Sequence, residues 1–135
     1  MNPIIEQEIM VLWGDYDVYS VDQKLASFER LKNAIHTEDI PQLIEFLKSK
    51  RSDFWVRELL SEPICEIGGA IYLNDLFDAF ALNEQDGHDN DSFSHFLIEL
   101  AQSDPRGCRQ NIVKLLQNPE YKHARIAEWL LTFCT

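Results

Sequence analysis

The sequence is poor in the residues that divide a chain into short segments, cross-link it or hold it in a membrane. Its 135 residues include only five Gly and five Pro, too few for a β-sandwich, which needs a turn about every 8–12 residues. The three Cys are odd in number and lack C-x-x-C spacing, so we expect reduced, buried thiols. No apolar run approaches the roughly 18 residues of a membrane span, and no basic segment precedes an apolar one near Met1. These absences favour a cytoplasmic protein.

Basic residues are scarce too. Twelve Lys and Arg stand against 23 Asp and Glu, a formal net charge of -11, which argues against nucleic acid or an anionic membrane as a direct ligand. Positions 58–105 contain no Lys or Arg but eleven acidic residues, and those eleven equal the whole excess. We therefore expect a field of one sign in the middle of the chain and a basic protein as its partner.

Apolar residues recur every three and four positions over most of the chain, which predicts a single all-α domain over residues 1–135. We expect helices at about 3–13, 53–67, 74–82 and 91–102, and the second of these ends at the glycines 68 and 69. Capping residues or first-turn prolines predict further helix starts, or support those above, at Ser20, Thr37, Asp53, Asp104 and Pro119.

An internal repeat follows from the apolar positions. Three triplets with the same spacing lie 33 residues apart, namely Leu60, Ile64, Ile67; Phe93, Leu97, Leu100; and Ile126, Leu130, Phe133. Helix pairs of this period cannot bury their apolar faces alone, so they stack on their neighbours. The pattern predicts three helix pairs over residues 37–134, forming a short right-handed α-solenoid, with residues 1–36 as an N-terminal helical cap.

Two segments resemble the second helix of a HEAT-like repeat. Residues 53–69, DFWVRELLSEPICEIGG, have Asp53 at the cap position and the pair Val56 and Arg57 in the first turn. Residues 121–133, YKHARIAEWLLTF, are similar, with Ala124 and Arg125 where that pair falls. The middle repeat departs from the pattern, because an acidic residue and a serine occupy these two positions.

The chain also resembles small acidic immunity proteins against bacterial toxins, through its IGG turn at 67–69 and its GHDND loop at 87–91. This resemblance implies a binding protein without catalytic residues. A nuclease toxin has a basic cleft because it binds a polyanion, so an acidic protein can cover that cleft. The predicted function is an immunity protein that neutralises a cationic, nuclease-type toxin. The alternative is a HEAT-like adaptor for another basic protein.

Acidic residues spaced four apart predict the binding surface. Glu58, Glu62 and Glu66 form one stripe on a helix, and the 33-residue offset carries this stripe onto the two later repeats. In a HEAT-like solenoid these rows would line the concave surface. The predicted partner-binding residues, on this ribbon and on the acidic segment beside it, are Glu58, Glu62, Glu66, Asp75, Asp78, Glu84, Asp86, His88, Asp89, Asp91, His95, Glu99 and Glu128. Candidate anchors, if they are exposed, are Tyr72, Phe77, His88, Phe93 and Trp129.

The loop at 84–91 has several carboxylates but does not match a calcium-binding loop. If Asp86 is position one of an EF-hand, position six is Asp91, where that loop requires glycine. We expect Asp89, Asn90 or Asp91 to cap the following helix instead.

Enzyme motifs such as G-x-S-x-G, H-E-x-x-H and a phosphate-binding glycine loop are absent from the sequence. The dipeptide of His88 and Asp89 resembles that of HD-type metal-dependent phosphohydrolases, which need further ligands on neighbouring helices. In an HD-type site His36, His95 and Asp91 would supply those further ligands. Glu62, His95 and Glu128 would form a separate divalent-ion site. We expect neither site, and predict a non-enzymatic protein without cofactor that is a monomer when free.

Overall fold

The computed structural model describes residues 2–135 and confirms the all-α class, with no β-strand among these residues. Its α-helices are α1 (Pro3–Trp13), α2 (Val21–Ala34), α3 (Ile40–Lys48), α4 (Phe54–Pro63), α5 (Leu73–Gln85), α6 (Asp91–Ser103), α7 (Pro105–Leu116) and α8 (Ala124–Leu131). Shorter turns are the 3-10 helices η1 (Thr37–Asp39) and η3 (Ala70–Tyr72) and the π-helical turn η2 (Ile64–Gly68). Among residues 2–135, no helix has the length and apolar character needed to cross a bilayer.

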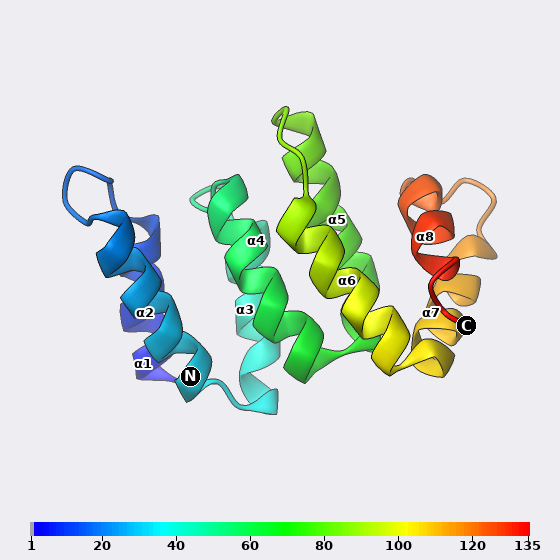
Figure 1. Ribbon diagram of the computed structural model, residues 1–135, viewed down its shortest axis with the longest axis horizontal. Helices are drawn as coiled ribbons and strands as arrows, with labels where there is room; N and C mark the ends of the chain where they lie inside the picture. The colour runs from blue at the N-terminus through cyan, green and yellow to red at the C-terminus, as the bar shows by residue number, and fades with distance from the viewer. Residues whose placement is uncertain (1) are drawn as a thin grey trace.

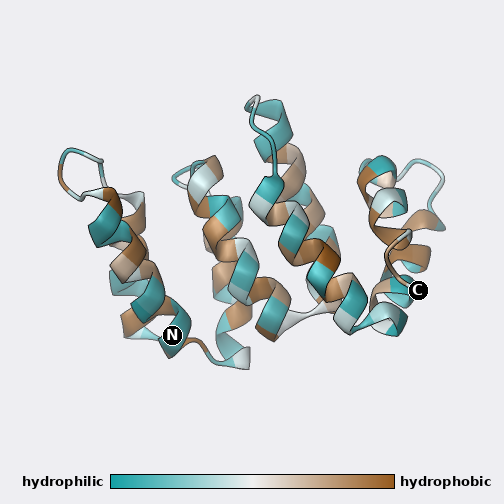
Figure 2. Cartoon of the chain, viewed as in Figure 1, coloured by the Kyte–Doolittle hydropathy of each residue, from teal (hydrophilic) through white to brown (hydrophobic). Residues whose placement is uncertain are grey.

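The helices lie in two rows (Figure 1). The even-numbered helices α2, α4, α6 and α8 are nearer the viewer, and the odd-numbered helices lie behind them. Along the front row α4 packs against α6 and α6 against α8, while in the back row α5 packs against both α3 and α7. Figure 2 shows apolar and polar residues interspersed along each helix, as amphipathic helices require.

One apolar core runs between these helices. The first two members of each predicted triplet are buried, namely Leu60, Ile64, Phe93, Leu97, Ile126 and Leu130. The third position of the first triplet is wrong, because Ile67 is 37% exposed. Pro63 ends the regular α-helix, and the wider π-helical turn that follows changes the angle between successive side chains. Gly69 then ends the segment with φ +81° and ψ -161°, a conformation that favours glycine but differs from the predicted left-handed stop.

Several helix starts are confirmed by their capping bonds. Ser20 and Gln23 form a reciprocal capping box at the start of α2. The side chains of Asp53 and Asp104 each accept a bond from the backbone N–H three residues on, at 2.9 and 3.0 Å. These caps are local, so they form wherever the adjacent chain is helical.

Two predicted starts are wrong. Thr37 opens only the short turn η1, and α3 begins at Ile40. Pro119 lies in a turn five residues before α8 begins. That turn is held by distant contacts, because Tyr121 donates to Asn74 at 2.7 Å and the ring of His123 lies 2.6 Å from an oxygen of Asp78.

Candidate partner-binding groove

The acidic middle of the chain is partly neutralised in three dimensions, which corrects the expectation of a field of one sign. Five of its eleven carboxylates pair with Lys or Arg from outside positions 58–105. The pairs are Glu62 with Lys32, Asp75 and Asp78 with Lys48, Glu84 with Arg125, and Asp86 with Arg57. Net charge therefore overstates the negative potential at these five positions.

Asp75 and Asp78 form a cluster on α5, in the back row of Figure 1. Lys48 of α3 pairs with both, and His123 and Lys122 from the turn before α8 also contact Asp78. Burial favours a higher pKa for Asp78, but hydrogen bonds from Lys48, His123 and Lys122 together lower it. Asp78 therefore connects α5 to α3 and to the turn before α8, whereas Asp75 connects α5 to α3.

The loop after α5 carries three of the predicted binding residues, and a fourth, Asp91, is the first residue of α6. Asp86 pairs with Arg57, while Asp89 and Asp91 are exposed and form no ion pair among the described residues. His88 is exposed, and its ring stacks on Phe54 with 3.6 Å between centroids and 14° between planes. The loop is thus fixed by its own contacts and presents two free carboxylates.

A buried amide network holds this loop from below. Arg57 donates to Asn83 at 2.8 Å, Asn83 donates to Asn90 at 2.9 Å, and Asn90 donates to the carbonyl of Phe80 at 3.1 Å. The expected local cap of α6 is therefore wrong, because the Asn90 side chain is used in this network.

Glu58 of α4 caps α6 instead. One of its oxygens, Oε2, accepts from the backbone N–H of Ser92 at 3.1 Å and of Phe93 at 3.2 Å. A carboxylate at a helix N-terminus also interacts favourably with the helix dipole. Glu58 consequently links two front helices across 34 residues of sequence.

Neither hypothetical metal set is brought together. Residues 2–135 contain no group of three or more His, Cys, Asp or Glu placed to hold a metal ion. Glu62 pairs with Lys32, and His95 pairs with Glu99 one turn later on α6 at 2.9 Å. The geometry therefore gives no support to metal chemistry at His88.

A groove of about 730 Å³ lies between η2 and α6, and we call it the acidic groove. Its lining residues are Cys65, Glu66, Gly69, Phe96, Glu99, Leu100, Gln102, Ser103 and Asp104. Three carboxylates and no Lys or Arg belong to this set. Burial raises the pKa of Cys65, which keeps its thiol neutral. The groove thus combines an apolar floor with a negative rim.

The carboxylates of the groove differ in how far they are engaged. Glu66 is exposed and forms no ion pair within residues 2–135. Glu99 is 54% exposed, and within the described part of the chain His95 is its only ion-pair partner. Asp104 uses one oxygen to cap α7 at the N–H of Gly107. Glu66 and Glu99 are therefore the two most available acceptors.

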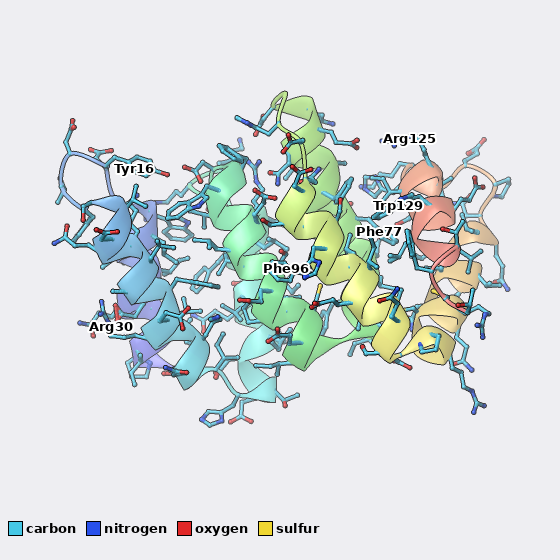
Figure 3. All side chains as sticks on the ribbon, in the orientation of Figure 1. Tyr16, Arg30, Phe77, Phe96, Arg125 and Trp129 are labelled. Atoms are coloured by element: carbon cyan, nitrogen blue, oxygen red, sulfur yellow. The ribbon has the colours of Figure 1, made fainter. Side chains whose placement is uncertain are left out.

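A smaller pocket of about 100 Å³ lies beside the groove, and we call it the aromatic pocket. It is lined by Phe28, Trp55, Glu58, Leu59, Glu62, Ser92 and Phe96. Phe96 belongs to both linings, so the two depressions share one wall. Figure 3 labels this residue where α4 and α6 lie next to each other.

The apolar part of this surface differs from the predicted anchors. Phe77 and Phe93 are fully buried, so they cannot contact a partner. Tyr72 and Trp129 are partly buried and lie outside both linings. The sequence interpretation missed Trp55 and Phe96 as surface residues. Phe96 precedes the buried Leu97 and widens the apolar stripe of α6 toward the acidic side, which is the signal that could have revealed it.

The predicted ribbon therefore divides into two kinds of residue. Glu66, Asp91, His95, Glu99 and Glu128 are exposed on the front helices or on η2. Glu58 and Glu62, the other two carboxylates of the first stripe, are half-buried and bound to neighbouring helices.

Comparison with family models, curated proteins and solved structures found no match to this chain. Its function must therefore be inferred from its own surface.

Proposed function

We propose that this chain is a protein-binding module and an immunity protein that neutralises a cationic, nuclease-type bacterial toxin. In this proposal the acidic groove covers the basic active site of the toxin. The observation that carries the proposal is the composition of the groove, which has three carboxylates, an apolar floor and no Lys or Arg.

The proposed architecture is a short right-handed HEAT-like solenoid of three helix pairs behind a cap of α1 and α2. Support comes from the 33-residue offset between apolar triplets that begin on α4, α6 and α8, together with the shared row of these helices in Figure 1. In such an array equivalent helices lie side by side and form a continuous binding surface.

Charge complementarity favours a basic partner for this surface. A nuclease cleft must carry positive potential to bind phosphates. Free carboxylates on the inhibitor then attract that cleft during encounter and can raise the association rate well above that of a neutral pair. Glu66 and Glu99 are the groove residues best placed to do so, because they lack a Lys or Arg partner within the described residues.

The apolar floor supplies packing energy, which attraction between charges alone does not provide. Interface energy is concentrated in a few well-packed, mostly aromatic residues, surrounded by polar groups that exclude water. Phe96 and Leu100 occupy the floor, with Glu66, Glu99 and Asp104 around them. This arrangement fits a high-affinity contact better than a purely electrostatic one.

The test uses the product of the gene next to the one for this chain, which the proposal predicts to contain a nuclease-type domain. We expect the purified chain to bind that domain and inhibit its cleavage of nucleic acid. Glu66→Gln with Glu99→Gln should weaken inhibition about tenfold or more, which corresponds to about 1.4 kcal/mol. The matched control is Glu45→Gln with Glu120→Gln, since both are exposed acids outside the groove and the pair changes net charge equally.

Two outcomes would contradict the proposal. A neighbouring gene for a metabolic enzyme, with no inhibition of any encoded nuclease, would favour the adaptor function for another basic protein. Equal loss of inhibition in the groove pair and the control pair would show that total charge, and not the groove, determines binding.

A further inference from the structure

We infer that the aromatic pocket binds the guanidinium group of one arginine side chain of the protein partner. The identity of that partner rests on the proposed function. The chemistry of the pocket is independent of it and can be tested with a small ligand.

The lining of the pocket suits a flat cation. Phe28, Trp55 and Phe96 contribute aromatic rings, and Glu58 and Glu62 contribute carboxylates. Aromatic faces attract cations through their quadrupole, and arginine stacks on them more readily than lysine because its charged group is planar. Rings and carboxylates in one small pocket are the combination that arginine recognition requires.

The chain already places one of its own cations at this site. The ammonium of Lys32 lies 5.1 Å from the centre of the Phe28 ring and 2.9 Å from Oε1 of Glu62. Lys32 therefore samples both of the interactions that we assign to the incoming guanidinium. Lys32 is not itself a lining residue, but it shows that two of the lining side chains, Phe28 and Glu62, accept a cation at the edge of the pocket.

Negative charge remains after Lys32 is counted. Oε2 of Glu58 caps α6, but its Oε1 accepts no hydrogen bond within residues 2–135. Glu62 likewise uses Oε1 for Lys32, and its Oε2 accepts none among the same residues. Two free carboxylate oxygens thus lie one helical turn apart on α4. A guanidinium has five donors in a fixed fork and can reach separate acceptors, whereas an ammonium acts as a point charge.

The volume of the pocket is also suited to a group of the size of a guanidinium. A volume of about 100 Å³ corresponds to about three water molecules in the liquid. It can hold a guanidinium but not a complete aromatic side chain. Because Phe96 separates the pocket from the acidic groove, the partner's neighbouring residues would continue into that groove.

The experiment is a titration of the isotope-labelled chain with N-acetyl-arginine methylamide, followed by NMR at the indole N–H of Trp55. The uncharged citrulline analogue is the matched ligand, since it keeps the shape of arginine and removes the charge. We expect a saturable shift with the arginine compound and none with citrulline. Equal shifts with the two compounds, or no saturable shift with arginine, would overturn the inference.

Substitutions separate binding from folding. Glu62→Gln should weaken arginine binding about tenfold, the usual scale for a lost charge-assisted bond. Lys32→Met should strengthen it about threefold, because it removes the competing cation and frees Glu62. Lys50→Met is the control, since Lys50 is exposed, forms no ion pair among the described residues and changes net charge equally. A misfolded variant cannot gain affinity, so an equal response of the two lysine variants would contradict the inference.

The two proposals fail in different ways. If arginine methylamide binds but no encoded nuclease is inhibited, the pocket is supported and the immunity function is wrong. If the nuclease is inhibited, the chain shows no saturable shift with arginine methylamide and Trp55→Leu leaves the affinity for the nuclease unchanged, the pocket assignment is wrong and the immunity function stands.

Discussion

Arg57 of α4 and Asp86 of the loop after α5 form an ion pair with 2.9 Å between Nη1 and Oδ2. The same nitrogen donates to Asn83, and Nε of Arg57 is buried without a hydrogen-bond partner in the described structure. The arginine side chain is 9% exposed, whereas that of Asp86 is 50% exposed. The loop that carries the free carboxylates is thus positioned from inside the protein.

This difference in exposure predicts that substitutions of Arg57 and of Asp86 lower the free energy of unfolding by different amounts. Arg57→Met should lower the free energy of unfolding by about 2–3 kcal/mol, because Asn83 loses a buried donor. Asp86→Asn should cost less than about 1 kcal/mol, since its carboxylate is half-exposed and solvent can replace the pair. Urea unfolding of both variants measures the difference. Equal losses would show that the ion pair, and not the buried amide contact, provides the stability.

Phe93 and Phe96 offer a second paired test, because they are three residues apart on α6 but face different surroundings. Phe93 is fully buried, and Phe93→Ala should cost about 3–5 kcal/mol. Phe96 is partly exposed in the groove, so Phe96→Ala should cost less stability and weaken partner binding more. Thermal unfolding and a binding measurement on the same samples distinguish the two roles. A large stability loss with unchanged binding at Phe96 would remove it from the interface.

The helix starts that could be predicted from sequence depend on contacts within three residues. Ser20 and Asp53 bond to backbone groups of their own first turn, so the local sequence contains both partners. The start of α8 could not be found this way. Its position depends on His123 meeting Asp78, which lies 45 residues earlier. Proline alone, at position 119, gave the wrong boundary.

The same distinction applies to the candidate site. The sequence contains the count of charges but not their pairing, and Glu62 meets Lys32 across 30 residues. Glu66, four positions later, has no such partner in the described structure, although the two residues look equivalent in the sequence. Only the position of Lys32 on α2, beside Glu62 of α4, separates them.

Acid sensitivity provides a third prediction, at Glu8 of α1. Glu8 accepts from Arg30 at 2.8 and 3.2 Å and from Ser27 at 3.1 Å. The hydrogen bonds from Arg30 outweigh burial, with Ser27 adding to them, and lower the pKa of Glu8. A carboxyl whose pKa is lower in the folded state stabilises the fold above its unfolded pKa, and this contribution is lost as pH falls through the folded value.

We therefore expect the free energy of unfolding to decline below about pH 4, the unfolded range for glutamate. Glu8→Gln should remove part of that decline, and urea unfolding across this range measures it. Glu6→Gln is the control, because Glu6 is exposed on the same helix and forms no ion pair among residues 2–135. If both variants change the slope equally, general charge repulsion and not the Arg30 contact explains the acid sensitivity.

The last prediction concerns how free and paired carboxylates affect association with the cationic partner. Asp89→Asn with Asp91→Asn removes two exposed, unpaired charges, so it should slow association and weaken its salt dependence. The stability cost should stay below about 1 kcal/mol, mainly from Asp91 in the first turn of α6. Asp75→Asn with Asp78→Asn removes the same formal charge but leaves Lys48 without its partners. That pair should lower stability more and association less, because exposed charges act only over about 8 Å at physiological salt and α5 lies in the back row. Stopped-flow association at several salt concentrations measures the association rate, and urea unfolding of each variant measures its stability. Equal slowing of association by the two double substitutions would mean that the position of the charge is irrelevant.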